Sequence, residues 1–215
     1  YWSISDIESI YNFGSIPTYA SDVNYEVNGY KILYSTVDHT GQSVIASGAI
    51  FVPITTNCPS PILSWQHGTI VADASAPSQK IDDLALGILS ASHGYVVIMS
   101  DYLGLGEGEG AHNYCHSDTE ASAIIDLIFA TNDFANGQGV DLNGQLFLMG
   151  YSQGGHSTMA AVKEIESSFV SDLNITASSP MAGPYSMSEA QSEMLDVVYP
   201  NPGYFPYVIF SYQNV

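Results

Sequence analysis

The feature that most constrains the fold is an apolar strand that runs directly into a glycine–serine–glycine turn. Residues 145–149 read Gln-Leu-Phe-Leu-Met and are followed by Gly150-Tyr151-Ser152-Gln153-Gly154. A turn this sharp strains the backbone at its central residue and admits only small residues two positions to either side. A helical pattern begins at Gly154. This context predicts that the Ser152 hydroxyl lies exposed at the carboxyl edge of a sheet, beside a helix N-terminus that favours negative charge.

Strands and helices alternate along most of the chain. Two β-rich runs, 29–37 and 44–53, are separated by a short polar segment and predict a hairpin. Apolar runs predict further strands at 61–65, 95–99, 145–149 and 175–177, and helical spacing predicts helices at 78–92, 117–130 and 154–169. In the second helix, Ser117 has the place of an N-cap and Glu120 that of its capping-box partner. The fold class is therefore α/β, a mainly parallel sheet with helices on both faces and an antiparallel hairpin at its edge.

Composition excludes several classes of function. The 215 residues are 46% hydrophobic, which is enough for one domain with a substantial core. Twenty-two acidic residues face only 3 basic ones, so the formal charge is −19. Binding to nucleic acid or to an anionic membrane surface needs cationic groups that the chain lacks. No run of apolar residues is long enough for a transmembrane helix.

The strand–turn–helix context makes Ser152 a candidate nucleophile. Acyl transfer to a serine creates an oxyanion, which needs two donors already aimed at it. The backbone N–H of Gln153 is one candidate, and the loop around Gly68 and Thr69, directly after the strand 61–65, supplies the other. His67 in that loop is expected to pack and to hold the loop in place rather than to act as the general base.

Four further residues are predicted to form the wall of the serine site, namely His67, Asp101, Tyr102 and Tyr151. The glycine-rich segment 104–110 after Tyr102 fits the spacing of a dinucleotide-binding loop. Glu107 and Glu109 would repel a pyrophosphate, however, and no helix is predicted to start there. We therefore expect no cofactor.

The two cysteines, Cys58 and Cys115, occur in predicted loops, and a disulfide between them would fit an exported protein. Two free thiols are the alternative. Metal-ligand residue types cluster near the second cysteine, but their spacing matches no recognised four-ligand zinc pattern: His112, Cys115, His116 and Asp118. The carboxylates of Glu107, Glu109 and Asp118 are a weak signal for calcium. We expect no metal site.

Four motifs in order along the chain resemble the α/β-hydrolase superfamily, and most closely the secretory lipase (lipase A-like) family and related bacterial esterases. They are Trp65-Gln66-His67-Gly68-Thr69, the run from Gly94-Tyr95 to Asp101-Tyr102-Leu103-Gly104-Leu105-Gly106, Glu120-Ala121-Ser122-Ala123, and Gly150-Tyr151-Ser152-Gln153-Gly154-Gly155-His156. The resemblance implies hydrolysis of a small-molecule or lipid ester by a Ser–His–Asp triad. It also implies a helical cap inserted after the sixth strand and a secreted or periplasmic location.

One departure from this family matters. Its triad runs serine, acid, histidine along the chain, but the only histidine after Ser152 is His156, in a helix that leads away from the site. Asp172 and Asp196 do not follow a suitable strand. We therefore expect residues 1–184 to be the N-terminal part of the core and 185–215 the start of the cap.

The missing base and acid leave the function open to three hypotheses. In the first, the protein is an ester hydrolase whose remaining strands, acid and histidine lie outside these residues, on a second chain or a further segment. That second chain, or a homo-oligomer, would cover the exposed apolar surface. In the second, the same scaffold serves a serine peptidase or an acyltransferase. In the third, the protein is an inactive, hydrolase-like binding protein.

Overall fold

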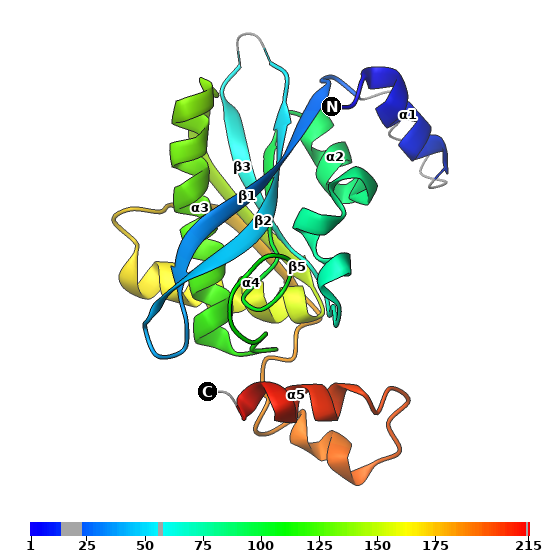
Figure 1. The fold of residues 1–215 in the computed structure, drawn as a ribbon, viewed down its shortest axis with the longest axis vertical. Helices are drawn as coiled ribbons and strands as arrows, with labels where there is room; N and C mark the ends of the chain where they lie inside the picture. Colours follow the sequence, from blue (N-terminus) through cyan, green and yellow to red (C-terminus); the bar gives the residue numbers. More distant parts are fainter. Residues whose placement is uncertain (14–22, 56–57, 214) are drawn as a thin grey trace.

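A sheet of six strands forms the centre of the molecule (Figure 1). The computed structural model describes residues 1–13, 23–55, 58–213 and 215. In spatial order the strands are β1 (Val27–Val37), β2 (Ser43–Pro53), β4 (Val96–Ser100), β3 (Ser60–Gln66), β5 (Leu142–Tyr151) and β6 (Ile175–Met181). β1, β2 and β4 are antiparallel neighbours, whereas β4, β3, β5 and β6 run parallel. The predicted α/β class, the hairpin and the mainly parallel sheet are confirmed.

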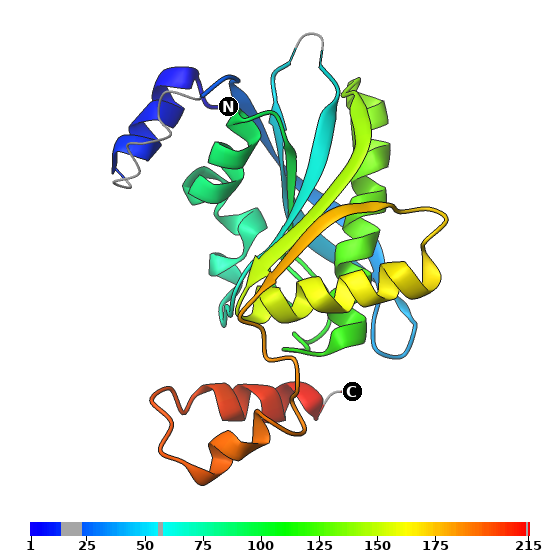
Figure 2. The ribbon, with the colours of Figure 1, turned by 180° about the vertical axis from the view of Figure 1, so that it is seen from behind.

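Helices cover both faces of this sheet, as Figures 1 and 2 show. α3 (Ser117–Gln138) and α4 (Gln153–Ser168) pack on one face, and α1 (Ile4–Phe13) and α2 (Ala85–Ser92) pack on the other. Successive residues of a strand point to opposite faces. In β2, Ile50 belongs to the α3–α4 core and Phe51 to the α2 core. Because both faces are buried, the inner strands read as continuous apolar runs.

Two predicted helix starts differ from the structure. The helix predicted over 78–92 is broken into the 3₁₀ turns η3 (Pro77–Gln79) and η4 (Ile81–Asp83), and α2 begins only at Ala85. The N–H of Ser78 donates to the Asp101 carboxylate instead of to a helical carbonyl. The predicted capping box is wrong as well, because His116 is the N-cap of α3 and the buried Glu120 side chain bonds elsewhere.

After β6 the chain leaves the sheet and forms a small cap at its carboxyl edge (Figure 2). We call residues 185–213 the cap segment; it contains the 3₁₀ helix η5 (Ser192–Asp196) and α5 (Tyr204–Tyr212). A further 3₁₀ turn, η2 (Asp73–Ser75), lies in the loop after β3.

Three side chains of α5 donate hydrogen bonds to carbonyl oxygens of loops on the core. Tyr207 donates to Ile70 (2.8 Å), Ser211 to His112 (3.2 Å) and Tyr212 to Cys115 (2.8 Å). These bonds fasten the cap segment to the two loops that flank the serine turn.

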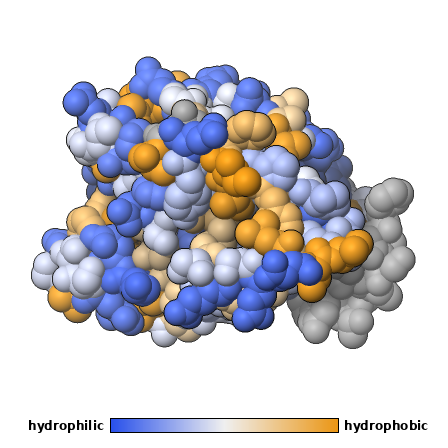
Figure 3. Space-filling view, turned by 90° about the horizontal axis from the view of Figure 1, so that it is seen from below, coloured by the Kyte–Doolittle hydropathy of each residue, from blue (hydrophilic) through white to orange (hydrophobic). Residues whose placement is uncertain are grey.

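Apolar side chains gather on the face of the molecule seen in Figure 3. In the cap segment, Leu195, Val197, Val198, Ile209 and Phe210 are exposed. Among the described residues, no helix combines the length and the apolar character that crossing a bilayer requires.

Candidate active site

The predicted serine turn is present. β5 ends at Tyr151, α4 begins at Gln153, and Ser152 between them has φ 61° and ψ −121°. A positive φ at a residue other than glycine stores strain, which functional sites commonly carry. A Cβ on Gly150 would collide with the carbonyl of Gly154, and a Cβ on Gly154 would collide with the carbonyl of Gln66. The structure thus explains why both flanking positions hold glycine.

The structure also brings the two predicted donor segments to this turn. Gln153 is the first residue of α4, and the first N–H groups of a helix have no acceptor within it. A Cβ on Gly68 would lie 3.8 Å from Cβ of Ser152, so the loop after β3 lies directly beside the serine. The Thr69 hydroxyl lies 2.8 Å from the Tyr114 hydroxyl, a contact that ties this loop to the loop before α3.

His67 is buried and faces the backbone. Its Nδ1 lies 2.7 Å from the carbonyl oxygen of Gly68, and its Nε2 lies 3.3 Å from that of Asp101. Its ring packs on Tyr102 with a centroid distance of 4.3 Å. Burial lowers the pKa of His67 and so favours the neutral ring. These contacts hold the loop that follows β3 in place.

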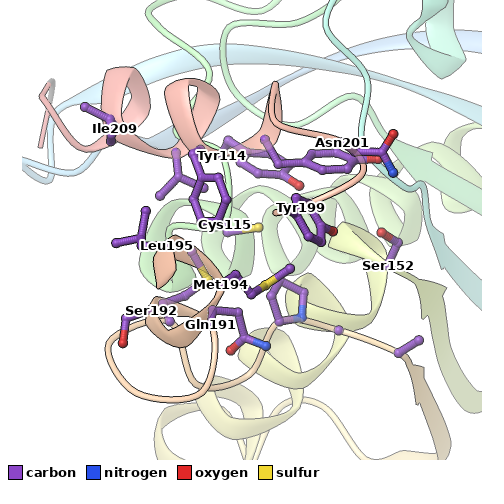
Figure 4. A pocket seen from close by; sticks show the side chains of 17 residues that line it. Tyr114, Cys115, Ser152, Gln191, Ser192, Met194, Leu195, Tyr199, Asn201 and Ile209 are labelled. Carbon is purple, nitrogen blue, oxygen red and sulfur yellow. The ribbon is translucent and has the colours of Figure 1, made fainter. Parts of the chain in front are cut away.

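Beside Ser152 lies a cavity of about 490 Å³, roofed by the cap segment (Figure 4). Met187, Met194 and Leu195 line it from the chain before α5, and Phe205 and Val208 line it from α5. The loop before α3 contributes Tyr114 and Cys115. A largely apolar space that ends at a nucleophile suits the apolar part of a substrate.

None of the four residues predicted to form the wall lines this cavity, namely His67, Asp101, Tyr102 and Tyr151. Three of them, His67, Asp101 and Tyr102, are buried, and their role at the site stays a prediction. The Asp101 carboxylate accepts hydrogen bonds from the Ser47 hydroxyl (2.5 Å) and the Ser78 N–H (2.8 Å). Tyr102, at φ 64°, donates its hydroxyl hydrogen to the carbonyl of His67 (3.2 Å). Tyr151 points to the surface and is 60% exposed.

Among the described residues, the Ser152 side chain has no hydrogen-bond partner. His156, one turn further along α4, is directed elsewhere: its Nδ1 lies 2.7 Å from a Glu120 oxygen and its Nε2 lies 3.4 Å from the Ser117 hydroxyl. This agrees with the expectation that His156 is not the base.

The structure gives Glu120 an environment that the sequence analysis did not predict. The Glu120 carboxylate is buried behind the serine turn and accepts four hydrogen bonds. Burial alone would raise the pKa of Glu120, but the hydrogen bond and charge of His156, with hydrogen bonds from Gln153 and Ser157, outweigh it and hold that pKa below its ordinary value. One signal was available: Glu120 precedes Ile124 by four residues, which places an acid on the apolar face of α3.

Within the described part of the chain, one group of metal-ligand residue types converges: Cys115, Glu120 and His156, with donor atoms within 4.8 Å of one another. Burial raises the pKa of the Cys115 thiol, and the Glu120 oxygens are already taken by hydrogen bonds. Hydrogen bonding therefore accounts for this cluster. In the glycine-rich loop, Glu107 pairs with Lys31, and Glu109 accepts the N–H of Ile45 (2.9 Å).

The predicted disulfide is wrong. Both cysteines are free, Cys58 exposed and Cys115 buried. Cys58 precedes the amino end of β3, whereas Cys115 lines the cavity at the carboxyl edge of the sheet. A strand of 7 residues such as β3 spans roughly 20 Å, far beyond the reach of a disulfide.

The mixed sheet, the strained serine and the helix that follows it define an α/β-hydrolase fold. The model of the secretory lipase family matches residues 70–186, more than half of the chain. The chain therefore belongs to the secretory lipase family, as the four motifs predicted.

Solved structures agree with this assignment. A putative hydrolase from Legionella pneumophila is 30% identical, and the match covers 99% of this chain and 58% of that one with a TM-score of 0.87. The rice cell wall degrading esterase LipA from Xanthomonas oryzae is 31% identical, and the match covers 97% of this chain and 57% of that one with a TM-score of 0.85. Candida antarctica lipase A is 25% identical over 79% of this chain and 39% of its own, with a TM-score of 0.58. The chain thus spans less than three fifths of the length of these proteins. The comparison with curated proteins gave no match.

Proposed function

We propose that the protein hydrolyses carboxylic esters, with Ser152 as the nucleophile. The observation that carries this proposal is the strained Ser152, which lies at the end of an apolar cavity, beside the first N–H of α4 and the Gly68 loop. The backbone N–H groups of Gln153 and of the Gly68–Thr69 turn are the proposed oxyanion donors. Membership of the secretory lipase family supports both the reaction and a secreted location.

In the proposed reaction, Ser152 Oγ forms a bond to the acyl carbon and gives its proton to a histidine. The negative charge that develops on the carbonyl oxygen is stabilised by the two donor segments, and collapse of the tetrahedral intermediate expels the alcohol, which takes the proton. Water then attacks the acyl-serine by the same route and releases the acid.

We place this histidine and its acid outside these 215 residues, since four of the six histidines are held by contacts with other groups. His67 is held by a backbone carbonyl, and His156 is held by Glu120. His112 packs against Tyr102, and its Nε2 lies 3.0 Å from the Gln153 amide nitrogen. His116 Nδ1 lies 3.1 Å from the Thr119 hydroxyl. The expected second chain or homo-oligomer stays a prediction.

The substrate we propose is an uncharged ester with an apolar acyl part. Methionine, leucine and aromatic side chains line the cavity beside Ser152. The net charge of −19 disfavours anionic substrates at low ionic strength. The named neighbours, a cell wall degrading esterase and a lipase, are consistent with this class.

A fluorophosphonate probe tests the proposal on the native protein. We expect the probe to label Ser152, as located by peptide mass spectrometry, and to abolish hydrolysis of p-nitrophenyl esters. Ser152→Ala should lower turnover by at least ~10³-fold with the fold intact. An unlabelled Ser152 in folded protein would refute the assignment.

Paired amide and ester substrates separate the competing hypotheses. We expect turnover of the esters and none of matching peptide amides. Comparable amide turnover would identify a peptidase instead. A folded native protein that is inert toward both substrates would identify a binding protein.

A further inference from the structure

Glu120 lies behind the serine turn, in the first turn of α3, and only 1% of its surface is exposed. Its Oε1 accepts the N–H of Cys115 (3.0 Å) and the amide of Gln153 (2.8 Å). Its Oε2 faces His156 Nδ1 (2.7 Å) and accepts the hydroxyl of Ser157 (2.6 Å). A carboxylate this deeply buried is tolerated only when such partners replace its water.

Three of these partners, Gln153, His156 and Ser157, belong to the first turns of α4. The helix therefore binds Glu120 with the very residues that follow the nucleophile. Each of these hydrogen bonds pulls the N-terminus of α4 toward α3, and together they restrict both translation and rotation of that terminus. The N–H of Gln153, which the proposed reaction uses, moves with it.

The Gln153 side chain is held at two points. Its Nε2 donates to Glu120 and lies 3.0 Å from His112 Nε2. His112 Nδ1 lies 3.0 Å from the carbonyl oxygen of Leu103, to which it can only donate, so Nε2 is the acceptor of the neutral ring. Burial lowers the pKa of His112, in accord with a neutral ring. Gln153 is thus fixed by an acid on one side and a neutral histidine on the other.

The fourth partner connects Glu120 to the cap segment. Cys115 has φ 57° and is fully buried, and its carbonyl oxygen accepts the hydroxyl of Tyr212 in α5. One carboxylate therefore connects the helix after the nucleophile to the loop on which the cap is fastened.

We propose that Glu120 is a positioning residue that fixes the Gln153 N–H against the oxyanion of the reaction. This inference rests on the proposed function and extends it to a residue that does not touch the substrate. A donor must meet the developing oxyanion within a few tenths of an ångström, and a misplacement of about 1 Å costs roughly 100-fold in rate. Glu120 should therefore act on kcat and leave the apolar binding contacts, and with them KM, unchanged.

The variant Glu120→Gln in the native protein tests the inference. Glutamine has the same shape, and its amide oxygen can keep the hydrogen bonds from Cys115 and Gln153. The amide nitrogen that replaces Oε2 cannot accept a hydrogen bond from Ser157 or from His156 Nδ1. We expect kcat, normalised to active sites by phosphonate titration, to fall at least ~10-fold with KM within ~2-fold. The rate of Ser152 phosphonylation should fall in parallel.

Asp126→Asn is the matched control, because Asp126 is a partly buried carboxylate of the same helix and, among the described residues, no hydrogen bond joins its side chain to the serine turn. It should keep kcat within ~2-fold of the wild type. If Glu120→Gln fails to fold, Ser157→Ala decides the question, since it removes the 2.6 Å hydrogen bond and leaves the charge in place. A several-fold loss of kcat at constant KM is then expected.

An unchanged normalised kcat in folded Glu120→Gln, or in Ser157→Ala where it decides, would overturn the positioning role while Ser152 remains the nucleophile. A rise in KM with kcat unchanged would overturn it too. A wild-type protein without esterase activity would remove the proposed function and this inference together, so the two failures are distinguishable.

Discussion

Two buried carboxylates lie close to the serine turn, and their surroundings shift their pKa values in opposite directions. Glu120 has a histidine partner and four hydrogen bonds, so its charged form is favoured. The Asp101 carboxylate accepts hydrogen bonds from Ser47 and Ser78, which are neutral donors. For Asp101, burial outweighs these hydrogen bonds and raises the pKa above its ordinary value. The two acids therefore contribute to stability with opposite dependence on pH.

We predict that Asp101 destabilises the folded protein progressively as pH rises above 3.8, the ordinary pKa of an aspartic acid. A folded-state pKa above the unfolded one means that the folded protein binds the proton more tightly, so stability is lost as pH rises through the raised pKa. Asp101→Asn should therefore gain stability over the wild type with rising pH, as measured by urea unfolding at pH 3 to 7. A constant or shrinking difference would contradict this.

At the scale of elements, the contact between α4 and β3 is the tightest approach near the site. Gly154 at the start of α4 lies against the backbone carbonyls of Gln66 and His67 at the end of β3. Gly155 lies equally close to the carbonyl of Met181 at the end of β6. The helix can enter this corner only because neither residue has a side chain, and the loop that follows β3 is positioned by the same contact.

We predict opposite outcomes for two glycine-to-alanine changes in neighbouring helices. Gly154→Ala should destabilise the protein by about 2–3 kcal/mol or more, because the new methyl meets backbone that cannot move aside. Gly137→Ala in α3 has open space around its new methyl and should stabilise by roughly 0.5–1 kcal/mol. Thermal and denaturant unfolding of the two variants measure both effects. Similar changes in both would show that helix propensity, and not the close contact, sets the result.

Sequence patterns predicted the elements that follow from the local spacing of apolar residues and glycines. They missed the features that depend on contacts between residues far apart in the chain. β5 and the serine turn followed from an apolar run with glycines at fixed spacing, and both are present. The start of α2 was misplaced because the hydrogen bond from Ser78 to Asp101 joins residues 23 positions apart. The predicted capping-box role of Glu120 failed for the same reason, since its partners Gln153 and His156 lie on another helix.

At the scale of the whole molecule, the cap segment forms one side of the cavity beside Ser152. α5 is fastened to the loops around Ile70, His112 and Cys115, so hydrogen bonds connect the roof of the cavity to the loop after β3 and to the loop before α3. The sequence predicted an apolar cap segment from a resemblance. The sequence could not predict the cavity itself, because its lining residues, such as Tyr114 and Val208, lie far apart in the chain and come together only in the fold.

We predict that Val208→Trp shortens the acyl chains that the enzyme accepts, given the proposed function. Val208 lines the cavity of about 490 Å³, and an indole there would occupy space otherwise open to several methylene groups. Each buried methylene contributes about 0.8 kcal/mol, so displacing three of them should lower kcat/KM for an octanoyl ester by roughly 50-fold. An acetyl ester should change less than ~3-fold, because its acyl part stays at Ser152.

Val198→Trp is the matched control for this test, since Val198 belongs to the same cap segment but is fully exposed and lies outside the cavity. It should leave the ratio of octanoyl to acetyl turnover unchanged. An equal loss for both esters in Val208→Trp would mean that the indole displaces the cap as a whole. An unchanged ratio in both variants would place the acyl chain elsewhere, and the apolar cavity would then need an occupant other than the substrate.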